Sequence, residues 1–198
     1  MKVFQLNNLS VLFAIIFMLI GVEFNSQENI AIVYLSRTEN TKAVAEIIQQ
    51  KIGGRLIKLE KESLYPENYQ EIVAQVAQEN EDGYLPPLKT KIANLAEYDI
   101  VFIGFPTWDM QMPPPMKSFL SENNLSGKTI IPFNTNAGYG VGQGFDQLKE
   151  LCPESKILKG FSVEGGYEKR GDFLAIKGER EENVSEQVNV WLIGIGII

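Results

Sequence analysis

The stretch IAIVYLSRTENT, Ile30 to Thr41, joins an apolar run to six residues that are mostly short and polar. The run Ile30–Leu35 has the composition of a parallel strand that is buried on both faces. After the polar turn, apolar residues recur at helical spacing at Val44, Ile47, Ile48 and Ile52. This order predicts a buried strand, a tight polar turn and a helix, which is the repeating unit of α/β sheets.

The same alternation of patterns continues to the end of the chain. Strands are predicted at residues 55–60, 99–105, 129–133 and 157–163, and helices at residues 68–79, 145–151 and 182–193 and from Met116 onward. The charged strand at 55–60 suits a sheet edge, whereas Pro132 is unusual in a central strand because it has no N–H to donate. Five strands alternating with helices predict one doubly wound α/β domain.

The composition excludes several classes of function. The 198 residues carry a net charge of -7, which argues against nucleic acid as a partner and suits docking onto a basic protein. Without histidine there is no imidazole metal site and no serine–histidine catalysis. A single cysteine excludes an internal disulfide and a zinc cluster. We interpret Cys152 as a small apolar residue near a helix end rather than as a reactive thiol.

Residues 1–26 differ from the rest of the chain. Lys2 precedes twelve uncharged residues, Val11 to Val22, and a glutamate follows them. This run has the length of the apolar part of a signal peptide and is short for a membrane span. We therefore interpret residues 1–26 as a signal peptide or an N-terminal membrane anchor, and residues 27–198 as the folded domain. The charges predict that the domain lies outside the cytoplasm, and a true start at Met18 would make the protein cytoplasmic.

In an open parallel sheet, ligands bind beyond the carboxyl ends of the strands. The turn SRTENT follows the first strand and begins a helix, whose free N–H groups and dipole attract phosphate. Short donors and one cation stand there: Ser36, Arg37, Thr38, Asn40 and Thr41. The turn has no Walker A glycine pattern. The alternative interpretation is a plain polar loop in which Asn40 or Thr41 caps the helix.

Two further loops that follow strands carry aromatic residues. The segment PTWDMQMPPP, Pro106 to Pro115, holds Trp108 in a rigid extended path that would suit stacking on a flat ring. The segment NTNAGYGVGQG, Asn134 to Gly144, presents Tyr139 among glycines that allow a ligand to approach the backbone closely. The alternatives are a core tryptophan and a flexible loop, but three such loops in succession favour a ligand site.

At these residues the chain resembles the flavodoxin family over about residues 30–195. SRTENTKAVAE is similar to the family's phosphate loop, S/T-x-T-G-N-T, and GFPTWDMQMPPPMKSFL is similar to its flavin loop. TNAGYG stands in the place of the second flavin loop. The resemblance implies a flavodoxin-like three-layer α/β/α fold with a five-stranded parallel sheet in the order 2-1-3-4-5. It also implies noncovalently bound FMN and electron transfer.

The resemblance implies a role for each matching residue. It places Ser36, Thr38, Asn40 and Thr41 on the phosphate with Arg37 nearby, Pro106, Thr107 and Trp108 beside the flavin ring, and Thr135, Asn136, Tyr139, Gly140 and Gly142 as further cofactor contacts. Glu39 departs from the family pattern because glycine usually stands there. Its carboxylate would repel phosphate unless it points to solvent, and its backbone is expected in a conformation that suits glycine.

A second departure is the segment Tyr167–Arg180, which is longer than a short connection requires and predicts an extra strand or a small flap. Three functions are compatible with the sequence. The first is an FMN-binding electron carrier that serves a redox partner protein. The second is an FMN-dependent NAD(P)H or quinone oxidoreductase, and the third is a non-redox domain with a degenerate flavin site.

Overall fold

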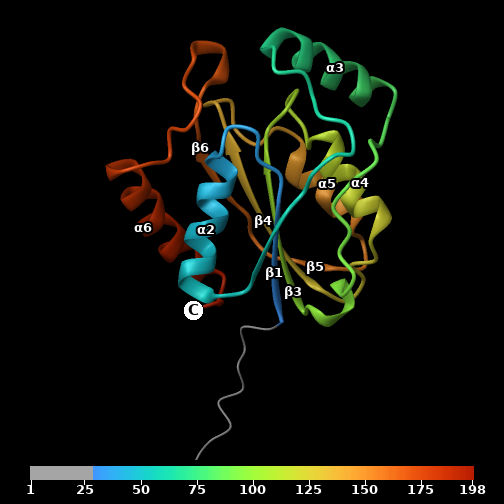
Figure 1. The fold of residues 1–198 in the computed structure, drawn as a ribbon. Helices are drawn as coiled ribbons and strands as arrows, with labels where there is room; N and C mark the ends of the chain where they lie inside the picture. Colours follow the sequence, from blue (N-terminus) through green and yellow to red (C-terminus); the bar gives the residue numbers. More distant parts are fainter. Residues whose placement is uncertain (1–28) are drawn as a thin grey trace, which may run out of the picture.

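The computed structural model describes residues 29–198, which form a parallel sheet between two layers of helices (Figure 1). The strand order is β2-β1-β3-β4-β5, and β6 also pairs with β4. This confirms the predicted doubly wound, flavodoxin-like fold. The interpretation of residues 1–26 as a leader lies outside the described residues.

The strands follow the apolar runs of the sequence. They are β1 Ile30–Tyr34, β2 Arg55–Lys58, β3 Ile100–Pro106, β4 Thr129–Asn136, β5 Lys156–Ile157 and β6 Phe161–Glu164. Every residue of β1 is buried, because β1 lies between β2 and β3 and helices cover both faces of the sheet. The strands all run in parallel, so their carboxyl ends meet at one edge of the sheet.

The prediction for the last two strands was incomplete. The fourth strand was expected to end at Phe133 but continues to Asn136, and the fifth is divided into β5 and β6. The carbonyl groups of Ile130 and Asn136 accept hydrogen bonds from the N–H groups of Leu158 and Gly165, which directly follow β5 and β6. In a strand, the backbone N–H and C=O groups of alternate residues point toward the same neighbouring strand. The backbone of Pro132 therefore also points toward the divided strand. Pro132 has no N–H to donate, and it lies opposite the break between β5 and β6.

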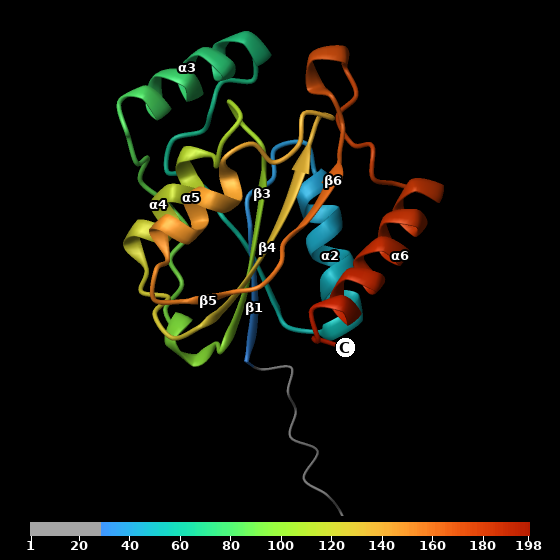
Figure 2. The same ribbon diagram turned by 180° about the vertical axis from the view of Figure 1, so that it is seen from behind.

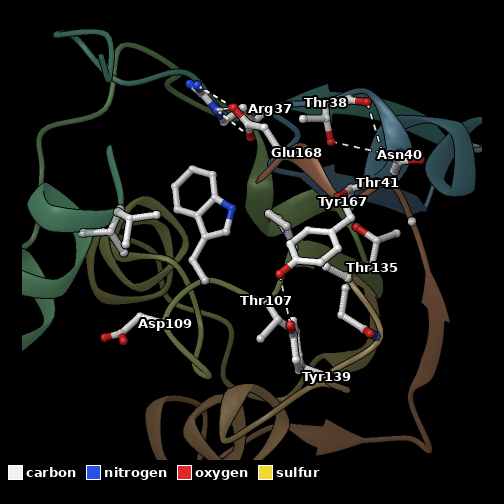
Figure 3. Close-up of a pocket in the computed structure, with 18 of the residues that line it drawn as sticks. Arg37, Thr38, Asn40, Thr41, Thr107, Asp109, Thr135, Tyr139, Tyr167 and Glu168 are labelled. Carbon is white, nitrogen blue, oxygen red and sulfur yellow. Dashed lines mark hydrogen bonds and ion pairs between the residues drawn. The ribbon is translucent and has the colours of Figure 1, made fainter. Parts of the chain in front are cut away.

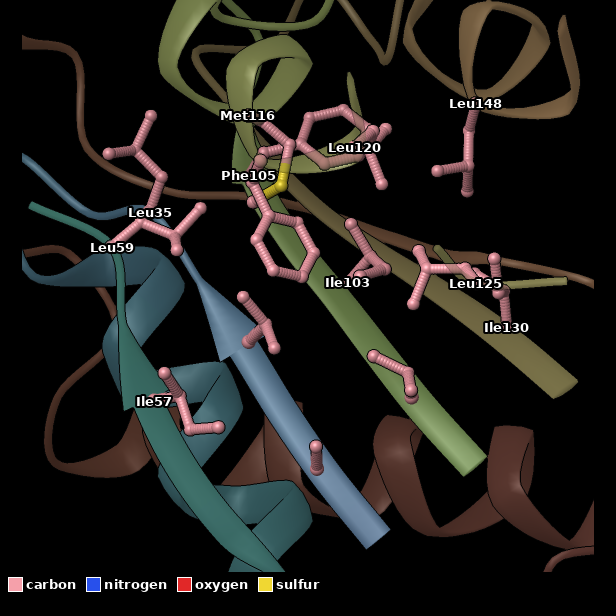
Figure 4. Close-up of a cluster of buried hydrophobic side chains, with 14 of the residues drawn as sticks. Leu35, Ile57, Leu59, Ile103, Phe105, Met116, Leu120, Leu125, Ile130 and Leu148 are labelled. Carbon is pink, nitrogen blue, oxygen red and sulfur yellow. The ribbon is translucent and has the colours of Figure 1, made fainter. Parts of the chain in front are cut away.

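The helices are α2 Asn40–Ile52, α3 Tyr69–Glu81, α4 Pro114–Glu122, α5 Gly144–Leu151 and α6 Glu179–Gly194, with short 3-10 helices at Leu95–Glu97 and Glu168–Arg170. Figures 1 and 2 show α2 and α6 on one face of the sheet and α4 and α5 on the other. Figure 4 shows the core beneath α4 and α5, where Phe105, Met116 and Leu148 are fully buried. Cys152 directly follows α5 and is buried in this core, as expected of a small apolar residue.

Helix α3 does not cover a face of the sheet. Both views of the ribbon place it beyond the carboxyl ends of the strands, above α4 and α5 (Figures 1 and 2). Asn68 caps its first turn by accepting hydrogen bonds from the N–H groups of Gln70 and Glu71. Its buried positions include Ile72 and Val76, whereas Val73 is half exposed. The helix therefore directs its apolar side toward the loops at this edge.

The segment Tyr167–Arg180 contains no strand in the structure, and the extra strand predicted as one alternative is absent from it. It consists of the short helix Glu168–Arg170, an irregular stretch and the start of α6. None of the helices in the described part of the chain is both long and apolar enough to cross a bilayer. The last helix instead buries Trp191 and Leu192 against the core.

Candidate functional site

A pocket of about 340 Å³ lies at the carboxyl edge of the sheet (Figure 3). Five segments line it: the loop after β1, helix α3, the loop after β3, the end of β4 with its loop, and the loop after β6. Its volume is within the range that binds small organic ligands. The predicted site residues that line it are Arg37, Thr38, Asn40, Thr41, Pro106, Thr107, Trp108, Thr135, Asn136 and Tyr139.

The loop after β1 has the geometry of an anion site. Glu39 immediately precedes α2 and adopts left-handed backbone angles, with φ at 63°. Such a residue before a helix turns successive N–H groups toward one side, which makes a concave anion-binding nest. Ser36 Oγ accepts a hydrogen bond from the N–H of Lys42 at 3.3 Å. Ser36 therefore supports the loop from behind and does not line the pocket.

The side chain of Glu39 is directed away from this nest. Its carboxylate lies 2.9 Å from Lys42 Nζ and 3.9 Å from Lys58 Nζ, and the residue does not line the pocket. The contact with Glu39 also raises the pKa of Lys42, so this amine stays charged. The two lysines therefore oppose the repulsion that the carboxylate would exert on a bound phosphate. The expectation that this position needs a glycine-like backbone is confirmed by its positive φ.

Asn40 binds the segment that follows β6. Its Nδ2 donates to the carbonyl of Phe173 at 2.5 Å, and its Oδ1 accepts from the N–H groups of Ala175 and Ile176 at 2.9 and 3.1 Å. Nδ2 also donates to Thr38 Oγ1 at 3.0 Å. The carboxamide is thus engaged within the protein. At the mouth of the nest, the hydroxyl group of Thr38 and the backbone N–H groups remain as the donors nearest the pocket (Figure 3). The hydroxyl group of Thr41 also lines the pocket but shares a hydrogen bond of 2.8 Å with the Thr135 hydroxyl group.

Arg37 also holds the surrounding loops together. Its guanidinium contacts both carboxylate oxygens of Glu168, at 2.8–3.0 Å, and donates to the carbonyl groups of Pro66 and Glu67 (Figure 3). This forked pair joins the loop after β1 to the loop before α3 and to the segment after β6. Arg37 was predicted to place a charge near phosphate, but Glu168 largely balances that charge.

Trp108 stands on a tight hairpin. Trp108 and Gln111 exchange backbone hydrogen bonds of 3.2 and 3.0 Å across Asp109 and Met110, which both have positive φ, 50° and 55°. Two consecutive positive φ values define a type I′ turn, which usually contains asparagine, aspartate or glycine. Gly142 lies close against this turn, and a Cβ added at Gly142 would be 2.0 Å from the carbonyl oxygen of Met110. Gly142 thus supports the hairpin that carries Trp108 and does not itself line the pocket.

Two tyrosines form the opposite side of the pocket. The hydroxyl groups of Tyr139 and Tyr167 lie 3.0 Å apart, and their rings meet edge to face at 6.0 Å (Figure 3). This hydrogen bond raises the pKa of Tyr139. Asn136 Oδ1 fixes the loop that presents Tyr139 by accepting hydrogen bonds from the N–H groups of Gly138 and Gly140, at 2.9 and 3.0 Å. Gly140 therefore belongs to the support of this loop rather than to the pocket wall.

Several lining residues were not predicted. They are Tyr69, Ile72, Val73, Val76, Met110, Gly165, Gly166, Tyr167 and Glu168. The helical spacing of apolar residues predicted that one side of α3 is buried, but this spacing does not indicate which part of the protein buries it. The segment Tyr167–Arg180, predicted as an extra strand or a small flap, includes Tyr167 and Glu168, but neither residue was assigned to the site.

An anion nest, an aromatic hairpin and a pair of tyrosines at the carboxyl edge of a 2-1-3-4-5 sheet define an α/β protein built to bind a phosphorylated, flat ligand. A comparison with protein-family models matches residues 29–172 to Flavodoxin. The chain therefore belongs to the flavodoxin family, as the sequence motifs predicted. A comparison with curated proteins finds no match.

Solved structures share the fold at low sequence identity. A protein of Bacteroides eggerthii, provisionally described as a flavoprotein, is 24% identical with a TM-score of 0.68, and the match covers 84% of this chain and 97% of that one. A similar protein of Bacteroides uniformis has 23% identity and a TM-score of 0.67, with 82% and 98% covered. A flavoprotein of Lactobacillus acidophilus, solved in complex with FMN, has 20% identity and a TM-score of 0.60, with 68% and 92% covered.

Proposed function

We propose that this chain binds FMN in the pocket at the carboxyl edge of the sheet and uses it to relay electrons between partner proteins. The observation that carries the proposal is the meeting of an anion nest, Trp108 and Tyr139 around one pocket of about 340 Å³. Membership of the flavodoxin family supports it. The FMN complex of the similar Lactobacillus acidophilus protein supports it further.

The residues present fit the cofactor. The backbone N–H groups after Thr38 and the hydroxyl groups of Thr38 and Thr41 would hold the phosphate. Trp108 offers the flat face on which the flavin ring would stack, and Thr135 and Asn136 lie between these two regions. When bound, FMN supplies the redox chemistry, while the protein supplies binding, orientation and electrostatics.

The charge around the pocket favours a low reduction potential. The carboxylates of Asp109 and Glu168 line it, and that of Glu164 lies against the Gly138 loop. Negative charges nearby oppose the addition of a further negative charge. Because Glu168 is paired with Arg37, the unpaired carboxylates would exert most of this effect.

An electron relay is favoured over an NAD(P)H or quinone oxidoreductase by the segment after β6. It is the part of the chain that could have formed a second substrate pocket. In the structure it is instead fastened to the phosphate loop through Arg37–Glu168 and through Asn40. A carrier requires only an accessible ring edge and complementary charge on its partner.

The experiment is to purify the protein, identify any nucleotide released on denaturation, and then follow reduction. We expect FMN rather than FAD, slow reduction by NADH or NADPH alone, and rapid reduction by dithionite or by a low-potential reductase. Rapid turnover of a quinone with NAD(P)H and no added protein would favour the oxidoreductase. A protein that neither contains nor takes up a flavin would favour a non-redox role.

Two substitutions test the assignment within the pocket. Trp108→Ala should weaken FMN binding by about 1 kcal/mol or more, because it removes ring stacking. Thr38→Ala should weaken FMN but not riboflavin, because it acts on the phosphate. Equal weakening of both ligands by Thr38→Ala would contradict the assignment of the phosphate site.

We further propose that the domain acts outside the cytoplasm, either released or anchored by residues 1–26. Figure 1 shows β1 beginning at the edge of the sheet away from α3, whereas the residues that line the pocket lie at the carboxyl ends of the strands. A chain anchored through its N-terminus could therefore present the pocket away from the membrane. Fractionation of cells that express the native N-terminus tests this, and a cytoplasmic protein whose mass begins at Met18 would contradict it.

A further inference from the structure

A partly buried cluster of polar side chains lies beside the pocket, between the loop before α3 and α3 itself. We name Lys61, Tyr65, Gln75 and Glu79 the Tyr65 cluster. The Tyr65 hydroxyl group donates to Glu79 Oε2 at 2.5 Å, and Gln75 Nε2 donates to Glu79 Oε1 at 2.7 Å. Lys61 Nζ lies 3.5 Å from Glu79 Oε1 and 3.2 Å from the centre of the Tyr65 ring.

Burying the charged groups of the Tyr65 cluster costs free energy that an apolar contact in the same place would not. The side chains of Lys61 and Glu79 are only 7% and 8% exposed, and burying an ion pair rarely adds stability over an apolar contact. Burial lowers the pKa of Lys61, and burial with the contact to Glu79 raises the pKa of Tyr65. In the described residues no buried side-chain polar atom lacks a partner. The buried polar atoms of the cluster thus all have hydrogen-bond partners. Glu79 holds the hydroxyl group of Tyr65, and Lys61 lies against one face of its ring.

The fixed ring of Tyr65 touches Trp108. The two ring centres are 5.4 Å apart and the planes are inclined at 84°, an edge-to-face contact. Trp108 is only partly buried and packs against the edge of the core, and the two central residues of its hairpin have unfavourable backbone angles. Nothing in the hairpin's backbone hydrogen bonds fixes the side-chain torsions of the indole. The contact with Tyr65 limits how the indole can turn.

From these contacts we propose that Tyr65, fixed by Glu79 and Lys61, is a positioning residue that holds the Trp108 indole in the orientation that receives the flavin ring. The inference rests on the proposed function, because it assumes that the ring stacks on Trp108. Tyr65 itself does not line the pocket. It acts through Trp108.

The position of α3, beyond the carboxyl ends of the strands and not on a face of the sheet, fits this role. By lying above the sheet edge, α3 brings Gln75 and Glu79 to Tyr65. The next residue, Asn80, donates to Asp109 Oδ2 on the hairpin at 3.1 Å and accepts from Lys117 Nζ at 2.9 Å. The helix therefore holds the Trp108 hairpin at two points, through the Tyr65 ring and through Asp109.

The test is a double-mutant cycle on FMN affinity in the full protein. Tyr65→Leu should raise the Kd for FMN about two- to tenfold, which corresponds to the worth of one aromatic pair. In the Trp108→Ala background the same change should have less than a twofold effect, because the side chain through which Tyr65 acts is gone. Equal effects in both backgrounds would overturn the proposal.

Conservative and matched controls separate positioning from folding. Tyr65→Phe keeps the ring and loses the hydrogen bond to Glu79, so it should fall between the wild type and Tyr65→Leu. Tyr98 is also buried in the core but does not line the pocket. Tyr98→Leu should lower the free energy of unfolding while leaving the FMN Kd of the folded protein unchanged. A change in Kd equal to that of Tyr65→Leu would show a general effect of core damage and would overturn the proposal.

A fluorescence measurement distinguishes failure of the proposal from failure of the proposed function. The sequence has two tryptophans, so in Trp191→Phe variants the emission comes from Trp108 alone. Without any flavin, Tyr65→Leu should shift this emission to longer wavelength and lower its anisotropy. An unchanged signal would overturn the positioning role, whereas the expected shift in a protein that binds no FMN would overturn only the proposed function.

Discussion

The hydroxyl groups of Thr41 and Thr135 lie 2.8 Å apart and are almost completely buried. Thr41 is in the first turn of α2, whereas Thr135 is near the end of β4. One hydrogen bond therefore fixes the distance between the loop after β1 and the strand that leads to Tyr139.

The isosteric change Thr41→Val should lower the free energy of unfolding by about 1–2 kcal/mol, because it leaves the Thr135 hydroxyl group buried without a partner. The double variant Thr41→Val with Thr135→Val should lose less than the sum of the single variants, because neither polar group then remains. Urea unfolding of all four proteins measures this. Strict additivity would show that the two hydroxyl groups contribute independently.

Replacing Glu39 by glycine should relieve the backbone at φ 63°. A left-handed residue costs roughly 1–2 kcal/mol when it is not glycine, although glycine also adds freedom to the unfolded chain. We expect a net gain of up to about 1 kcal/mol in the free energy of unfolding, together with tighter FMN binding. Glu39→Gln is the matched control because it removes the charge but keeps the strain, so it should improve FMN binding only. A stability gain of equal size in both variants would rule out backbone relief as the cause.

Gly142 and Gly140 form a matched pair in the same loop. Both have positive φ, but a Cβ at Gly142 would meet the Met110 carbonyl oxygen, whereas a Cβ at Gly140 would meet open space. Gly140→Ala should cost roughly 1–2 kcal/mol for its backbone conformation alone. Gly142→Ala should cost more and should also weaken FMN binding, because the Trp108 hairpin must move. Equal losses measured by urea unfolding and FMN titration would contradict the close approach.

Burial raises the pKa of Cys152 to about 11 from its usual value of 9.0. Between these values only the unfolded chain loses the thiol proton, so the stability present below pH 9 is lost as pH rises toward 11. In urea unfolding, the wild type should therefore lose stability more steeply over this range than Cys152→Ala, by at most about 1.4 kcal/mol per pH unit. Parallel pH profiles would mean that the thiol ionises equally in both states.

The sequence predicted the strand–turn–helix unit at Ile30–Ile52 because all of its signals are local. The apolar run, the polar turn and the helical spacing each agree with the final structure. Ten of the thirteen predicted site residues line the pocket for the same reason, since carboxyl ends of parallel strands must meet. The supporting roles of Ser36, Gly140 and Gly142 depend on contacts between loops, which spacing along the chain does not reveal.

The position of α3 could not be read from its sequence. The apolar side formed by Ile72 and Val76 predicts burial, but it is equally compatible with a sheet face and with the loops above it. Likewise, Asn134 and Asn136 are polar and do not resemble strand residues. They extend β4 because Asn134 donates to the Phe105 carbonyl group and Asn136 to Ser162 Oγ. Such partners come from distant parts of the chain.

The break opposite Pro132 has a further consequence, for aggregation. An exposed sheet edge can recruit a strand from another molecule when it is long and regular. Here one edge is β2, four residues that include Arg55 and Lys58, and the other is divided between the two residues of β5 and the four of β6. The edge divided opposite Pro132 and the four-residue edge β2 are therefore both too short to serve as templates. At high concentration the folded domain should resist edge-to-edge fibril formation.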